Sequence, residues 1–124
     1  RYNDAWTRQK METWVRQTAI AAAAEVGARF DITFASTGVL FLTKPGTLVD
    51  TLKTAVKSVT GRAPALTTGG GTSDARFIKD HCPVVEFGLV NATIHQVDEQ
   101  TSVKDLEDLT EIYDRFISNF FASA

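Results

Sequence analysis

The sequence has few of the features that would link it to an oxidising compartment, to nucleic acid or to a membrane. Its one cysteine, Cys82, has no partner in the chain for a disulfide. The formal net charge of −2 argues against non-specific binding of nucleic acid, which requires a basic surface. No apolar run approaches the roughly 20 residues of a membrane span, and no signal peptide is visible. We therefore expect a cytoplasmic protein that binds neither nucleic acid nor membrane.

The periodicity of apolar residues predicts helices and strands in alternation. At 124 residues and 44% apolar content, the chain is long and apolar enough for one globular core. Ser102 with Asp105, and Thr47 with Asp50, resemble helix-capping pairs. The sequence thus predicts a mixed α/β fold. Helices are expected over 6–26, 47–60, 74–79 and 102–121, and strands over 30–34, 64–66 and 83–87.

Two polar loops flank the strand predicted over 83–87. The first, at 69–77, reads Gly-Gly-Gly-Thr-Ser-Asp-Ala-Arg-Phe, and its glycines suit a turn with positive φ or a close approach of the backbone. The second, at 91–99, reads Asn-Ala-Thr-Ile-His-Gln-Val-Asp-Glu and leaves the end of the strand. Sites in α/β folds lie where loops leave strand ends, so both loops are candidates for one shared site.

Three kinds of side chain in these loops have more than one interpretation. The imidazole of His95 suits zinc, but a lone histidine is more often structural or exposed. Arg76 is either a bidentate partner for a carboxylate or a surface arginine. Asp98 and Glu99 either orient the ring of a metal-bound histidine or are solvated acids. The residue types alone leave all of these alternatives open.

Four sequence motifs carry a resemblance to a known family. They are Phe-Leu-Thr-Lys-Pro-Gly at 41–46, Gly-Gly-Thr-Ser-Asp-Ala-Arg-Phe at 70–77, Val-Glu-Phe-Gly at 85–88 and Asn-Ala-Thr-Ile-His at 91–95. With them the chain resembles the C-terminal part of the bacterial succinyl-diaminopimelate desuccinylase family, dinuclear zinc amidohydrolases of lysine and diaminopimelate biosynthesis. The resemblance covers nearly the whole chain. Because the family's chains are much longer, it implies that this sequence is a fragment.

The resemblance also implies a division into domains. Residues 1–39 correspond to the second half of a βαββαβ-type lid, through which the family forms homodimers. Residues 40–124 correspond to the C-terminal portion of the zinc-bearing catalytic domain. We expect the same two parts, and the same dimer, in the full-length parent of this chain.

The family's site residues map onto both loops and onto the end of the lid. His95 corresponds to a ligand of one of two zinc ions, for which cobalt is an alternative. The base and the other ligands belong to a part of the family that has no counterpart here, so no catalytic residue is assigned. The chain departs from the family at Thr37, which stands in place of a serine, and at Leu89, where proline is common. The residues expected to bind substrate are Thr37, Gly71, Thr72, Ser73, Arg76 and Asn91.

The activity implied for the full-length parent is hydrolysis of N-succinyl-diaminopimelate to succinate and diaminopimelate by a zinc-activated water. The fragment itself is expected to be inactive. Acetylornithine deacetylase, or a related amino-acid deacylase, is the alternative enzyme. A non-catalytic dimerisation module is the alternative outside catalysis, and the intact polar set in the two loops argues against it, because a scaffold needs none of those side chains.

Overall fold

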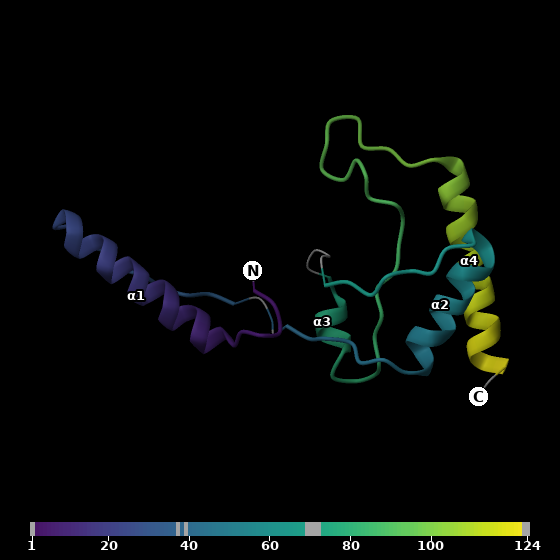
Figure 1. Ribbon diagram of the computed structural model, residues 1–124, viewed down its shortest axis with the longest axis horizontal. Helices are drawn as coiled ribbons and strands as arrows, with labels where there is room; N and C mark the ends of the chain where they lie inside the picture. The colour runs from purple at the N-terminus through teal and green to yellow at the C-terminus, as the bar shows by residue number, and fades with distance from the viewer. Residues whose placement is uncertain (1, 37, 39, 69–72, 123–124) are drawn as a thin grey trace. The chain divides into compact units, whose positions relative to one another are not determined.

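The computed structural model describes residues 2–36, 38, 40–68 and 73–122 and separates into two compact units, Arg1–Leu42 and Thr43–Ala124. Four helices lie in the described residues, close to where the sequence predicts them (Figure 1). They are α1 (Arg8–Val26), α2 (Thr47–Thr60), α3 (Ala75–Ile78) and α4 (Val103–Ala122). None of these helices combines the length and apolarity that crossing a membrane requires.

The predicted α/β fold class is wrong, because the described residues form helices and irregular segments but no strand. The expected βαββαβ-type lid is likewise not found in them. A strand requires a neighbour with which it exchanges backbone hydrogen bonds. Among described residues, no such bond joins 30–34, 64–66 or 83–87 to another segment.

The alternating pattern that suggested a strand does correspond to a pattern of burial. Ile32 and Phe34 are half-buried, whereas Asp31 and Thr33 are exposed. Alternation therefore identified two of the three apolar side chains of the pattern as turned away from water, whereas Phe30 is 45% exposed. It did not supply the hydrogen-bonded neighbour, because pairing depends on residues distant in sequence.

In the first unit, α1 is defined by its two ends. Thr7 precedes the helix, and its Oγ1 accepts a hydrogen bond from the Lys10 backbone N–H at 3.2 Å. Gly27 ends it in the left-handed conformation, with φ 66°, and donates its N–H to the Ala23 carbonyl. No side chain of α1 itself is buried. Local capping, and not core packing, is thus what this helix visibly has.

The two predicted caps of the second unit have different outcomes. At α4, Ser102 Oγ accepts the Asp105 N–H at 3.0 Å and donates to Asp105 Oδ2 at 2.6 Å, as predicted. At α2, the expected Thr47–Asp50 pair does not form. The helix begins after Gly46, which has no side chain with which to cap it, and the Gly46 carbonyl accepts the Asp50 N–H at 3.0 Å.

The core of the second unit lies between α2 and α4, which run side by side in Figure 1. Ala55 is 0% exposed and Ile112 is 3% exposed, and Leu52 and Val56 complete the buried cluster. Complete burial of a Val, Leu or Ile side chain stabilises a fold by about 1.5–3 kcal/mol. The half-buried side chains that pack against this cluster are Val59, Val85, Phe87 and Phe116.

Ile112→Ala should lower the free energy of unfolding by about 2–5 kcal/mol, because it removes a buried side chain and leaves a cavity. Ile117→Ala, on the same helix but 52% exposed, is the matched control and should cost less than about 1 kcal/mol. Urea unfolding measures both. Equal losses in the two variants would contradict the assignment of the core to the α2–α4 interface.

Candidate functional site

The first polar loop ends in the short helix α3, and Ser73 fixes how that helix starts. Ser73 Oγ accepts the Ala75 N–H at 3.1 Å, and the Ser73 carbonyl accepts the Arg76 N–H at 3.5 Å. Ala75 is buried, with 8% exposure, so the turn is attached to the second unit. These contacts hold Ser73 half-buried at the start of α3.

Arg76 is half-buried and carries a hydrogen-bond donor that the described residues do not satisfy. Its guanidinium carbon lies 4.7 Å from the centre of the Phe77 ring, within the range of a cation–π contact. Its Nε atom is buried and has no partner among the described residues. An unsatisfied buried donor is unfavourable, and an acceptor such as a carboxylate would relieve it.

Three of the predicted substrate-binding residues, Thr37, Gly71 and Thr72, lie outside the described residues. The remaining three, Ser73, Arg76 and Asn91, lie in the second unit.

The second polar loop is stabilised by its own hydrogen bonds. Thr93 closes its base: Thr93 Oγ1 donates to the Gln100 carbonyl at 2.9 Å and accepts the Gln100 N–H at 3.0 Å. Gln96 donates its side-chain amide to the Ala92 carbonyl at 3.2 Å, and the Asn91 carbonyl accepts the Ile94 N–H at 3.2 Å. The loop over 91–100, hereafter the His95 loop, is therefore a braced unit.

His95 lies exposed in this loop, in a backbone conformation that few non-glycine residues adopt. Its φ is 63°, and Asp98 has the same value. Glu99 does not orient the imidazole: its Oε2 accepts the His95 backbone N–H at 3.3 Å instead. Among the described residues no hydrogen bond reaches the His95 ring, so its nitrogens are available to a ligand.

The His95 loop is connected to α3 by the elongated segment 83–88, which Figure 1 shows rising between them. Thr43 Oγ1 donates to the Val84 carbonyl, and Tyr113 Oη donates to the Phe87 carbonyl at 2.6 Å. Neither tie was predicted from sequence, because a backbone carbonyl as acceptor leaves no residue-type signal. Thr43 at least lies within the family word at 41–46. Tyr113 occupies an ordinary apolar position of α4.

No hydrogen bond or ion pair within the described part of the chain joins α3 to the His95 loop. Ser73 and Arg76 are thus placed together at one turn, and Asn91 and His95 together at another. The segment 83–88 is the covalent link between the two turns.

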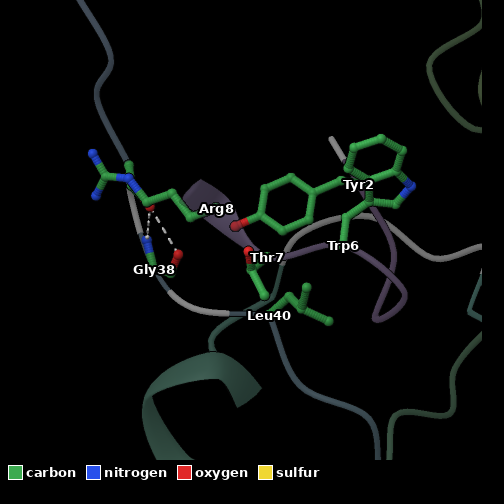
Figure 2. Close-up of a pocket in the computed structure, with 7 residues that line it drawn as sticks. Tyr2, Trp6, Thr7, Arg8, Gly38 and Leu40 are labelled. Atoms are coloured by element: carbon green, nitrogen blue, oxygen red, sulfur yellow. Dashed lines mark hydrogen bonds between the residues drawn. The ribbon is translucent and has the colours of Figure 1, made fainter. Parts of the chain in front are cut away.

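The first unit has a concavity of its own, of about 460 Å³. Figure 2 shows Tyr2, Trp6 and Leu40 around it, with Gly38 hydrogen-bonded to Ser36 at its edge. Arg8 also lines it, and the hydrogen bond to Glu12 raises the pKa of the Arg8 guanidinium, which stays charged. None of these side chains was predicted as a site residue. The predicted Thr37 is adjacent in sequence to Ser36 and Gly38.

A zinc site would require more than the described residues provide. They contain no group of three His, Cys, Asp or Glu side chains able to hold a metal ion. Zinc sites use three or four protein ligands. The exposed His95 imidazole fits one position of such a site, and a dinuclear centre would need further ligands from elsewhere.

Comparison with known proteins identifies the class of this chain. Residues 7–119 match the family model of peptidase family M20/M25/M40. Because this match spans most of the sequence, the chain belongs to that family.

Two curated relatives show which enzyme of this family the chain is similar to. The chain is 50% identical over 124 residues to a succinyl-diaminopimelate desuccinylase of Rhodospirillum centenum. The matched region covers 100% of this chain and 31% of that protein. It is 48% identical over 121 residues to a succinyl-diaminopimelate desuccinylase of Rhodospirillum rubrum, covering 98% of this chain and 31% of the relative. The resemblance seen in the sequence words is confirmed, and the chain spans about a third of the length of these relatives.

His95→Ala should change the free energy of unfolding of the chain by no more than about 0.5 kcal/mol, because the ring is exposed and has no hydrogen bond among the described residues. Urea unfolding of the variant and of the unaltered chain tests this. A loss greater than about 1 kcal/mol would show that the ring has a structural role that its surroundings do not reveal.

Proposed function

We propose that this sequence serves a metal-dependent amidohydrolase that converts N-succinyl-diaminopimelate to succinate and diaminopimelate. The observation that carries the proposal is the 50% identity, along the entire chain, to a protein named for that activity. The chain provides the anion-binding turn and one metal ligand. The relatives are about three times as long, and the remaining ligands and the base are assigned to the part of such a protein that this chain does not match.

Arg76 is assigned to a carboxylate of the substrate. The substrate has carboxylates on both its diamino acid and succinyl parts, and a guanidinium binds such a group through two parallel hydrogen bonds. The unsatisfied Nε of Arg76 supports this role, because a bound carboxylate would give it an acceptor. Ser73 lies at the same turn, and Gly71 and Thr72 are proposed to complete the anion pocket.

His95 and Asn91 are assigned to the same substrate site as Arg76. The exposed imidazole of His95 is proposed to hold one of two zinc ions, and cobalt is a candidate replacement. The metal ions supply an acidified water for attack on an amide carbonyl. Asn91, four residues before His95 in the same braced loop, is proposed to bind substrate, and Thr37 is proposed to do so from the first unit.

The proposed domains follow the same alignment with the family. Residues 1–39 are proposed to belong to a lid that forms the homodimer, and residues 40–124 to the catalytic domain. The separation into units at Leu42 and Thr43 supports a boundary in this region. We propose the cytoplasm as the location, because the single cysteine needs no oxidising environment.

A hybrid enzyme tests the activity. This chain replaces the matching segment of the Rhodospirillum centenum protein, and zinc content and turnover are measured. We expect hydrolysis of the succinyl substrate in preference to acetylornithine. We expect His95→Ala to remove one metal ion and most of the turnover. His81→Ala, which removes the other histidine, is the control and should leave zinc content and turnover unchanged.

The 124-residue chain alone should show no turnover with added zinc, because its described residues contain no group of three His, Cys, Asp or Glu side chains able to hold a metal ion, and the base is assigned to the part of the relatives that this chain does not match. Hydrolysis by the chain alone would contradict the assignment of the base and the remaining metal ligands to the part of the protein that this chain does not match. Full metal content and turnover in the His95→Ala hybrid would contradict the role of His95. A hybrid that preferred the acetyl substrate would favour the acetylornithine deacetylase alternative.

Arg76→Lys in the hybrid should lower kcat/KM by about one to two decades. The charge is kept, but the bidentate geometry is lost, and a hydrogen bond to a charged group contributes about 1.5–3 kcal/mol. Arg62→Lys, at an exposed position of the same unit, is the matched control. Steady-state kinetics measure both, and equal values for the two variants would contradict the assignment of Arg76 to the substrate.

A further inference from the structure

The position of the His95 loop depends on side chains, because the backbone leading to it has no backbone partner. Segment 83–88 makes no backbone–backbone hydrogen bond to any other described segment. Two side-chain hydroxyls hold it instead: Thr43 at the Val84 carbonyl and Tyr113 at the Phe87 carbonyl. Of these two ties, that of Tyr113 lies closer to the loop.

The contact at Tyr113 has two components. Its hydroxyl lies 2.6 Å from the Phe87 carbonyl oxygen, and its ring meets the Phe87 ring edge-on, with centroids 6.5 Å apart and planes at 73°. Phe87 in turn packs against the α2–α4 core. The geometry therefore fixes both the backbone and the side chain of Phe87 relative to α4.

Both ends of the His95 loop are attached to the same helix. The end near Phe87 is held by Tyr113, on the third turn of α4. The other end leads into Ser102, which caps α4 through Asp105. Between these ends the loop is braced by the hydrogen bonds of Thr93 and Gln96. A braced loop that is held at both ends moves only as far as its anchors allow.

We propose that Tyr113 is a positioning residue for the proposed metal ligand His95 and for Asn91. Its hydroxyl holds segment 83–88 against α4, and so determines where the side chains of the His95 loop lie. This inference rests on the proposed function for the role of His95. The anchoring itself rests on the hydrogen bond and the ring contact alone.

Substituting a residue that merely stabilises α4 should leave the His95 loop unchanged, whereas substituting a positioning residue should alter it. Ser58 provides the comparison. Ser58 Oγ accepts a hydrogen bond from Arg115 Nη1 at 3.1 Å and so joins α2 to α4, and neither side chain has a hydrogen bond to segment 83–88 among the described residues. Tyr113→Phe removes one hydroxyl and keeps the ring, whereas Ser58→Ala removes one hydroxyl from the helix interface. The two variants should lower thermal stability by similar amounts.

The first measurement is nuclear spin relaxation of the backbone amides in the 124-residue chain. In the unaltered chain the amides of Ile94, Gln96 and Gln100 should have order parameters in the rigid range, near about 0.85. Tyr113→Phe should lower them toward about 0.6, while Ser58→Ala should leave them unchanged. Values already below about 0.6 in the unaltered chain, or no difference between the variants, would overturn the proposal.

The second measurement is the zinc dissociation constant of the hybrid enzyme, obtained by competition with a chelator. Tyr113→Phe should raise it about threefold to tenfold, the effect of losing one hydrogen bond of ordinary strength. Ser58→Ala should leave it unchanged. If His95→Ala leaves the metal content unaltered, the proposed role of His95 fails, while the relaxation result still decides whether Tyr113 holds the loop. If His95→Ala does remove a metal ion and Tyr113→Phe leaves zinc affinity unchanged, the positioning role fails.

Discussion

The packing of α2 against α4 is the interaction on which the described part of the second unit depends. Ala55 has no exposed surface, and its small side chain lets the two helices approach closely around Ile112. Elements without a hydrogen-bonded ladder of their own are held against this pair. Segment 83–88, for example, contributes Val85 and Phe87 to the edge of the core. In this unit, tertiary position is set by side chains packed on two helices.

Asn91 and His95, the proposed site residues of the His95 loop, lie where that core exerts little direct restraint. Asn91 and His95 are exposed, and short-range hydrogen bonds, with no burial, give their loop its shape. His95 also adopts a positive φ that is unfavourable for a residue with a Cβ.

The parts of this structure that were predictable from sequence are those set by neighbours along the chain. The period of the apolar residues located α2 and α4, and Ser102 with Asp105 located the start of α4, because caps and helical turns are local. The strands were predicted from alternation and are not present in the described residues. A strand needs a partner that a local pattern does not specify.

The same distinction applies to the candidate site. Family words located His95 and Arg76, whereas the Tyr113 hydroxyl reaches a carbonyl 26 residues earlier, which no motif encodes. Residue type and spacing also suggested Glu99 as a carboxylate that could orient the His95 ring. It does contact His95, but through the backbone N–H and not the ring. For His95 and Glu99 the sequence thus indicated two residues that lie near one another, and the contact decided what Glu99 does there.

The absence of buried side chains in α1 has a consequence for how the molecule opens. A 19-residue helix whose own side chains are all at least partly exposed is only slightly longer than the shortest helices that persist alone in water, and its ends rely on Thr7 and Gly27. Its amide protons should then exchange with solvent through fraying of the helix itself, whereas those of α2 near Ala55 should exchange only when the packed pair separates. The chain accordingly has two tiers of local stability, and heating or denaturant would report them as separate steps when followed at α1 and at α2.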